Sequence, residues 1–446
     1  MLRRVTEKYV EECSAPDSRL RHAAHEMNLP ATYGESYGRL MLDRPLFASE
    51  SEISGFAADL SGLFDILTSL PARLFGGDLR RYCDALGMDG RLAELMCRGA
   101  SGRPPLYARA DAYHDGSAFK LLELNIGSQL GGTDFAQLNR AFLDVPAFKE
   151  FAQEHRLGHI DTLARLTRTL RETGGTVTDG EPVVALIEAR GGIDAHRHVF
   201  DALREAMLDH GVRLLLGEVQ ELGERNGKVT LRGAPLDVVL RYFVASEVAD
   251  DRAGQDSLDL LVRAHHAGRT VLYTPLEGAM FASKGSLALL HDPRTRETFS
   301  PAEHAVVDRV MPWTRLLGAD RHTAAQHAEL LDRCREQQED LVLKPGVGHG
   351  GVGTVIGHEV TEEQWRQALL DRAAGDHVVQ ERVRPVPEPV VDAETGAVAD
   401  WVANWGVFVD TGGYAGGFVR ALKPDDGAVV AFANPGTRST CVFTAP

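Results

Sequence analysis

Apolar residues recur at helical spacing through most of the first hundred residues. "FAADLSGLFDILTSLPARLF" and "LRRYCDALGMDGRLAELMCRG" both show this period, which is typical of amphipathic helices. The spacing returns over residues 134–173, where "HIDTLARLTRTLRETGG" ends on glycines, a common helix C-cap. Residues 105–125 have β character instead. We therefore predict a helical N-terminal region, residues 1–104, followed by a unit over residues 105–175 that begins with strands.

A different pattern, short apolar runs separated by a helix, begins near residue 180. "PVVALIEA", "VRLLLGEV" and "LDVVLRYF" are typical of buried strands, and "DAHRHVFDALREAMLDHG" of a helix with Asp194 as its N-cap. The alternation predicts a small α/β domain with a parallel sheet over residues 176–250. Its first turn lacks GxGxxG and does not indicate a dinucleotide site. His196 and His198 have no further ligand at metal spacing, so we interpret them as exposed helix histidines.

Lysine-bearing segments of β character follow over residues 251–446. We predict strands in "MFASKGSLALL", "DLVLKPGVG", "HVVQERV", "WVANWGVFVDTGG" and "GGFVRALKP". "TEEQWRQALLDRAAG" is predicted as a helix that starts with a Thr361–Gln364 capping box and ends at a glycine. Residues 384–400, "RPVPEPVVDAETGAVAD", are predicted to be the most flexible stretch.

Composition is that of an ordinary soluble protein, with 43% hydrophobic and 25% charged residues. No run of 18 apolar residues indicates a transmembrane helix, and the N-terminus lacks the apolar part of a signal peptide. Five scattered cysteines form neither CxxC nor a zinc spacing. We expect a cytoplasmic protein with no membrane contact. A net charge of −16 argues against nucleic acid as a partner, and a homodimer stays open.

The glycine-rich stretch "LVLKPGVGHGGVGTVIG" spans Leu341 to Gly357 and contains a GxGxxG match. A dinucleotide fingerprint needs a helix after the glycines, whereas Val355 and Ile356 favour a strand. A P-loop needs its lysine after the glycines, and Lys344 precedes them. We predict a strand–loop–strand hairpin. Its backbone N–H groups can approach an anion closely; the alternative is a flexible surface hairpin.

Carboxylates gather in "LYARADAYHDGSAFKLLELNIGSQLGG". Arg109 and Asp111 share one strand face, and Glu123 and Asn125 share one face of the next strand. A two-residue loop would put the two pairs on opposite sides of the hairpin. We predict an odd loop of three residues, 115–117, which pairs His114 with Ala118 and Arg109 with Glu123, so that the faces coincide.

Coinciding faces would present the oxygens of Asp111, Glu123 and Asn125 to a hard cation such as Mg²⁺. Arg109 would then lie beside them and could bind a phosphoryl oxygen. The alternative is a solvated hairpin with a cross-strand salt bridge. The apolar run "FKLLEL" favours a buried strand, in which unpaired carboxylates would be costly.

In this order, the motifs resemble those of circularly permuted ATP-grasp ligases, specifically the synthetase domain of glutathionylspermidine synthase and its relatives. The resemblance lies in R-x-D and E-x-N at residues 109–111 and 123–125, "SKGSLALL" with Lys284, the K-P…G…G-G loop after Lys344, Gln380-Glu381 in "VVQERV", and "GGFVRA" with Arg420. It implies an α/β (α+β) fold. The ATP-grasp core would be in permuted order, interrupted by the small Rossmann-like domain.

The resemblance also implies ATP and Mg²⁺ as cofactors and a role for each matched residue. Asp111, Glu123 and Asn125 would bind the metal, and Lys284 and Lys344 the phosphates. Gly348, Gly350 and Gly351 would cover the phosphates, and Gln380 and Glu381 would lie beside the adenine. Arg109 and Arg420 would steady the transferring group.

The implied reaction is ligation of a carboxylate to an amine through an acyl phosphate, with small molecules as the partners. The family has "D-T-P-T" after E-x-N, whereas this chain has "IGSQLGG", and we expect no room for the amidase domain. We therefore expect a relative with another substrate pair than glutathione and spermidine. Two alternatives stay open: a small-molecule kinase on the same fold, and a non-catalytic nucleotide-binding protein.

Overall fold

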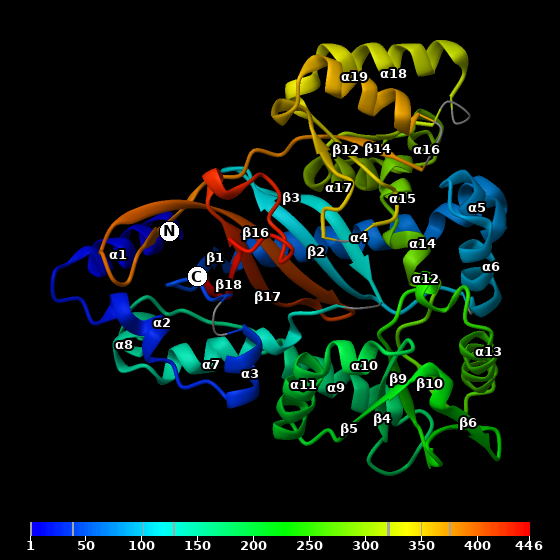
Figure 1. Ribbon diagram of the computed structural model, residues 1–446, viewed down its shortest axis with the longest axis horizontal. Coiled ribbons are helices and arrows are strands. Elements are labelled where there is room, and N and C mark those ends of the chain that lie inside the picture. Colours follow the sequence, from blue (N-terminus) through cyan, green and yellow to red (C-terminus); the bar gives the residue numbers. More distant parts are fainter. Residues whose placement is uncertain are drawn as a thin grey trace.

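The computed structural model describes residues 2–37, 40–100, 102–127, 130–318, 322–348, 350–373 and 376–446. Figure 1 shows a central sheet, a small α/β layer below it, and a second small sheet covered by helices above it. Within the described ranges, strand pairing defines one seven-stranded sheet, two four-stranded sheets and one three-stranded sheet. This mixture of helices and sheets confirms the predicted α/β (α+β) class.

The central sheet combines strands from both ends of the chain. Its order is β1-β18-β17-β16-β2-β3, with β15 also paired to β16. β1 is parallel to β18, and the other neighbours are antiparallel. The strands are β1 (Leu46–Ser49), β2 (Tyr107–His114), β3 (Phe119–Ile126), β15 (Glu388–Val391), β16 (Val398–Asp410), β17 (Gly413–Leu422) and β18 (Arg438–Ala445). Because β2 pairs directly with β16, residues far apart in the sequence meet on one sheet face.

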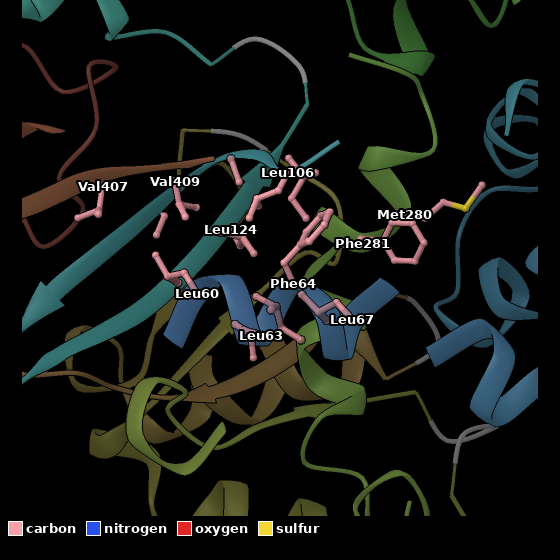
Figure 2. Packing of buried hydrophobic residues seen from close by; sticks show 14 of the residues in the cluster. Leu60, Leu63, Phe64, Leu67, Leu106, Leu124, Met280, Phe281, Val407 and Val409 are labelled. Carbon is pink, nitrogen blue, oxygen red and sulfur yellow. The ribbon is translucent and has the colours of Figure 1, made fainter. Parts of the chain in front are cut away.

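The long helix α4 (Glu50–Phe75) covers one face of this sheet. Leu60, Leu63, Phe64 and Leu67 of α4 belong to one buried cluster with Leu124, Val407 and Val409 of the strands, part of which Figure 2 shows. Each such side chain contributes about 1.5–3 kcal/mol when fully buried. Among the described residues, α4 alone is long and apolar enough to cross a membrane. Its burial in the core explains that composition equally well.

The remaining helices of the N-terminal region agree with the predicted helical segment. They are α1 (Leu2–Ser14), α2 (Ala23–Glu26), α3 (Ala31–Tyr37), α5 (Leu79–Ala85) and α6 (Gly90–Gly99). The strand β1 inside this region was not predicted, because its partner β18 lies at the other end of the chain. The helices expected over 134–173 form as α7 (Ala136–Asp144), α8 (Pro146–Glu154) and α9 (Thr162–Gly174).

The small α/β domain has the predicted parallel sheet, in the order β10-β9-β4-β5. Its strands are β4 (Val184–Glu188), β5 (Leu214–Glu218), β9 (Val238–Arg241) and β10 (Val271–Leu272). A three-stranded sheet joins it, formed by β6 (Leu222–Arg225), β7 (Lys228–Leu231) and β8 (Ala234–Pro235). Its helices are α10 (Gly192–Ala195), α11 (Arg197–Asp209), α12 (Ala245–Val248) and α13 (Arg252–His266).

The prediction that Asp194 caps the helix after β4 is wrong. Asp194 lies inside α10, which begins directly after Gly191, and α11 starts two residues further on with His196 at its N-cap position. Gly191 has a φ of 78°. This left-handed conformation lets the chain enter a helix without a side-chain cap.

The upper sheet has the order β11-β14-β12-β13 and is antiparallel. Its strands are β11 (Thr314–Leu316), β12 (Leu341–Lys344), β13 (Val355–Ile356) and β14 (Val378–Glu381). The nearby helices are α14 (Gly278–Ala282), α15 (Lys284–Leu289), α16 (Pro293–Arg296), α17 (Pro301–Val310), α18 (Ala324–Glu336) and α19 (Glu362–Arg372). The Thr361–Gln364 capping box of α19 is confirmed. The predicted glycine end at Gly375 lies outside the described residues.

The segment with Lys284 is helical and not a strand, so that prediction is wrong. Ser283 interrupts the helix, and its side chain caps α15 by accepting a hydrogen bond from the backbone N–H of Gly285. Residues 384–400 are also more ordered than predicted, because β15 pairs with β16 across this stretch. The start of α15 is also held by a distant contact, from the backbone N–H of Lys284 to the carbonyl of Gly346, whereas β15 and β16 pair residues that are 7–13 positions apart.

Candidate active site

Strands β2 and β3 present their polar residues on one face of the central sheet. Arg109 pairs with Asn125, and Asp111 pairs with Glu123. The predicted shared face is thus confirmed, but the predicted loop and register are wrong. His114 pairs with Phe119, so the connecting loop has four residues, 115–118, instead of three.

A β-bulge at Leu122 makes the two faces coincide despite the even loop. Ala112 pairs with Leu121, whereas Asp111 pairs with Glu123, so Leu122 is the extra residue. The bulge reverses the alternation of β3. Phe119 and Leu121 before it, and Leu124 and Ile126 after it, are all buried. Glu123 and Asn125 consequently lie on the side opposite to this core.

Asp111 is buried between two arginines. Arg109 Nε donates to Asp111 Oδ1 at 2.9 Å, and Arg420 Nη2 donates to Oδ2 at 2.6 Å. Burial alone would raise the pKa of the Asp111 carboxyl, but the charges and hydrogen bonds of the two arginines outweigh it and hold the pKa well below its usual range. Arg109 also donates to the carbonyl of Gly131 at 2.8 Å.

Glu123 forms an ion pair with the predicted phosphate lysine Lys284. Glu123 Oε2 lies 3.0 Å from Lys284 Nζ, which also donates to the carbonyl of Gly348 at 3.3 Å. The backbone N–H of Lys284 donates to the carbonyl of Gly346 at 2.9 Å. The start of α15 is therefore fastened to the glycine hairpin at two points. Asn125 lies beside Glu123, with its amide nitrogen 3.5 Å from Glu123 Oε1.

Lys344 points into the same site and is held by Gln380. Lys344 Nζ donates to Gln380 Oε1 at 2.6 Å, and Gln380 Nε2 donates to Thr314 Oγ1 at 3.1 Å. Burial, followed by the charge of Lys284, lowers the pKa of Lys344 to about 8, against the opposite influence of Glu123. Both ends of the Gln380 side-chain amide therefore have protein partners, Lys344 and Thr314.

The glycine stretch forms the predicted hairpin, because β12 and β13 pair antiparallel on either side of it. This geometry excludes the helix that a dinucleotide fingerprint requires. Gly351 has a φ of 76°, and a Cβ on it would lie 2.4 Å from Cγ1 of Val429. The hairpin thus lies close against the segment between β17 and β18.

A cavity of about 300 Å³ lies between the central sheet, the upper sheet and the hairpin. Ten of the predicted site residues line it, namely Asp111, Glu123, Lys284, Lys344, Gly348, Gly350, Gly351, Gln380, Glu381 and Arg420. Arg109 and Asn125 do not line it and lie behind Asp111 and Glu123 as their hydrogen-bond partners. Residues that are far apart in the sequence are therefore brought together in one cavity, as Asp111 and Arg420, 309 positions apart, show.

Sequence reasoning missed several cavity residues, most notably Asn404. Asn404 pairs with Arg420 across β16 and β17, is 7% exposed and lines the cavity. Its Oδ1 and Arg420 Nε are buried atoms for which the described residues supply no hydrogen-bond partner. A signal was present, since Asn404 is a polar residue within the apolar run "WVANWGVFV". Tyr113 and Val429 also line the cavity.

No protein-family model and no curated protein matches the chain. A solved structure does: a glutathione synthetase-like effector from Globodera pallida, in its apo form, aligns over 100% of this chain and 98% of its own, with 13% identity and a TM-score of 0.57. The chain has a glutathione synthetase-like fold. A protein provisionally named gamma-glutamylcysteine synthetase, from Methylobacillus flagellatus KT, aligns over 90% of both chains with 14% identity, but its TM-score of 0.42 supports no further argument.

Within this glutathione synthetase-like fold, the donor set fits a hard divalent cation bound together with phosphates. The described residues hold no group of three or more His, Cys, Asp and Glu side chains placed to form a metal cage. Asp111 and Glu123 are nevertheless direct cross-strand neighbours with an amide, Asn125, beside them. Mg²⁺ commonly takes one or two carboxylates and completes its octahedron with water and phosphate oxygens.

Proposed function

We propose that the protein is an ATP- and Mg²⁺-dependent carboxylate–amine ligase that forms an amide or peptide bond through an acyl phosphate. One observation carries the proposal: Asp111 and Glu123, paired across two strands, lie in the same cavity as Lys284, Lys344 and the glycine hairpin. The glutathione synthetase-like fold supports it. The permuted order of the core, the likeness to glutathionylspermidine synthase and a small amino-acid-like or peptide substrate are further parts of this proposal.

The chemistry needs charge neutralisation and positioning more than a protein nucleophile. Lys284 and Lys344 bind phosphate oxygens, and the hairpin covers them and excludes water from the acyl phosphate. Asp111 and Glu123, which line the cavity, would hold Mg²⁺, and Asn125 behind Glu123 would orient that carboxylate. The metal would neutralise phosphate charge. Arg420 lines the cavity and would steady the transferring group.

The reaction has two steps. A carboxylate oxygen of the substrate forms a bond to the γ-phosphorus of ATP, and the bond from that phosphorus to the bridging oxygen of ADP breaks. The amine nitrogen then attacks the acyl carbon, the carbon–oxygen bond to phosphate breaks, and the nitrogen loses a proton. The products are an amide, ADP and phosphate.

The test is ADP release over a panel of acid–amine pairs, with mass analysis of each product. We expect an amide and ADP in equal amounts for at least one pair, and no product with Glu123→Gln. Glu362→Gln, a change at the exposed start of α19, is the matched control and should keep full activity. ADP with a phosphorylated acid and no amide would instead support a kinase. Nucleotide binding without any ADP release would support a non-catalytic protein.

A further inference from the structure

Four residues form one row across the central sheet at the predicted metal site. Phe418 of β17 pairs with Gly406 of β16, Gly406 pairs with Asp111 of β2, and Asp111 pairs with Glu123 of β3. Gly406 has no side chain, so the space above it is left to its neighbours. Phe418 fills that space and is only 2% exposed.

The ring of Phe418 contacts both arginines that hold Asp111. The guanidinium carbon of Arg109 lies 5.5 Å from the ring centre, and that of Arg420 lies 5.8 Å from it. Each distance is within the range of a cation–π contact. Arg109 binds one carboxylate oxygen of Asp111 and Arg420 the other. One aromatic ring therefore touches both cations that flank this carboxylate.

Two glycines leave room for the ring. A Cβ on Gly406 would lie 2.7 Å from Cε1 of Phe418 and 3.3 Å from Cδ of Arg109. A Cβ on Gly132 would lie 2.4 Å from Cε1 of the same ring. Such distances are shorter than ordinary packing contacts. The backbone on both sides of Phe418 thus fits the ring closely.

We propose that Phe418 is a positioning residue that sets the places of Arg109 and Arg420 on the two oxygens of Asp111. Its role in phosphoryl transfer rests on the proposed ligase function, but the positioning itself does not. Arg420 Nε has no hydrogen-bond partner among the described residues. Among the described residues, one hydrogen bond to Asp111 and two aromatic rings hold its guanidinium: the buried ring of Phe418 at 5.8 Å and the exposed ring of Phe432 at 6.0 Å. Without the ring of Phe418, Arg420 loses that support on the side of Gly406.

The first experiment measures the arginine contacts without any turnover. The exchange rate of the Arg109 Nε proton with water is followed by nuclear magnetic resonance, with Arg109→Lys to assign the signal. We expect slow exchange in the wild type and at least about tenfold faster exchange in Phe418→Ala, because the guanidinium is no longer confined. Phe443→Leu, at a buried ring of β18 that packs on Phe148, is the matched control and should leave the rate unchanged. Equal exchange rates in the wild type and Phe418→Ala would overturn the proposal, whether or not the protein is a ligase.

The second experiment separates positioning from general packing. Phe418→Leu should lower kcat by about tenfold to a hundredfold, since small misplacements of a catalytic group have effects of this size. The KM for ATP should change by less than about threefold, because binding before the reaction is little affected. An equal fall in kcat with Phe443→Leu would show a merely structural role.

A double variant provides the third readout. Gly406→Ala forces a methyl group against Phe418 and Arg109, so it should lower both stability and kcat. Gly406→Ala combined with Phe418→Leu should regain stability relative to Gly406→Ala alone, because the smaller side chain makes room. Strictly additive losses in stability would contradict the close fit between residue 406 and the ring.

Discussion

Lys344 Nζ donates to Gln380 Oε1 at 2.6 Å, and this bond suggests a second role for Gln380. The resemblance to the permuted ligases placed Gln380 beside the adenine. In the structure both ends of its amide are engaged, by Lys344 and by Thr314. Its side chain therefore orients Lys344, the lysine that binds phosphate in the proposed function.

Gln380→Leu should weaken ATP binding by about tenfold or more, because a hydrogen bond to a charged group contributes about 1.5–3 kcal/mol. Calorimetric titration with ATP and with GTP measures this effect. Thr314→Val, which removes only the outer support of Gln380, should give a smaller loss. A loss confined to ATP, with GTP binding unchanged or improved, would contradict this role and favour recognition of the base.

Nucleotide affinity should fall as the pH rises through about 8, because burial and Lys284 lower the pKa of Lys344 to about 8. Above this pH the free protein holds Lys344 mostly neutral, whereas phosphate oxygens favour its ammonium form. Binding must then take up a proton, and the affinity falls by up to about tenfold per pH unit. Below this pH the lysine is already charged, and the dependence should vanish.

Calorimetry in two buffers of different ionisation enthalpy measures the proton uptake directly. We expect close to one proton per bound nucleotide above the pKa of Lys344. Lys344→Arg is the control, since a guanidinium stays charged throughout this range. Uptake that persists unchanged in Lys344→Arg would assign the proton to another group.

Asp111→Ala should destabilise the fold as well as abolish turnover. It would leave Arg109 and Arg420 buried without their shared carboxylate, and breaking a buried pair costs about 3–5 kcal/mol. Asp111→Asn keeps the shape of the side chain and should lose less stability than Asp111→Ala. Glu123→Gln should cost only about 1 kcal/mol, because Glu123 is partly exposed and Lys284 is its one ion-pair partner among the described residues. Urea unfolding at neutral pH measures the free energy of unfolding of these three variants.

The stability of the Asp111 variants at low pH tests whether Asp111 is ionised in the folded protein. Burial raises the pKa of Asp111, but the two arginines lower it by more, so the pKa lies below its usual range. Its stabilising effect is therefore complete above the unfolded pKa of about 3.9 and is lost as the pH falls through the folded pKa. The stability difference between the wild type and Asp111→Asn should narrow below about pH 4. A difference that stays constant into strong acid would mean that Asp111 is not ionised in the fold.

Patterns within single strands were enough to predict much of the site. Alternation placed Arg109 with Asp111 and Glu123 with Asn125, and the apolar runs predicted the parallel sheet of the small domain. The β-branched residues after the glycines predicted the hairpin, which β12 and β13 confirm. These features depend on a few neighbouring residues, so a local reading of the sequence finds them.

Features that depend on distant contacts were not predicted. The apolar run around Lys284 suits a strand or a buried helix, and only its packing and the bond to the Gly346 carbonyl fix the start of α15. Asn404 belongs to the site because β16 lies between β2 and β17. No spacing in the sequence shows that Phe418 touches both Arg109 and Arg420.

The bulge at Leu122 leads to a final prediction about one residue. In "FKLLELNI" the doublet Leu121–Leu122 breaks the alternation, and deleting one leucine restores it. The shortened strand can keep Asp111 opposite Glu123 in a regular ladder, so we expect cooperative unfolding with little loss of stability. Leu122 lines the cavity, however, and its carbonyl lies 3.4 Å from Lys344 Nζ.

The deletion should therefore weaken nucleotide binding while the fold persists, because a bulge re-aims the backbone beside a site. Thermal unfolding and calorimetric titration of the deletion variant measure the two effects separately. Deleting Ser117 from the exposed loop between β2 and β3 is the control, since it leaves the bulge and the cavity intact. Unchanged nucleotide affinity in the variant without the bulge would contradict this prediction. The extra residue would then serve only to keep the buried faces of β2 and β3 on the same side despite the four-residue loop.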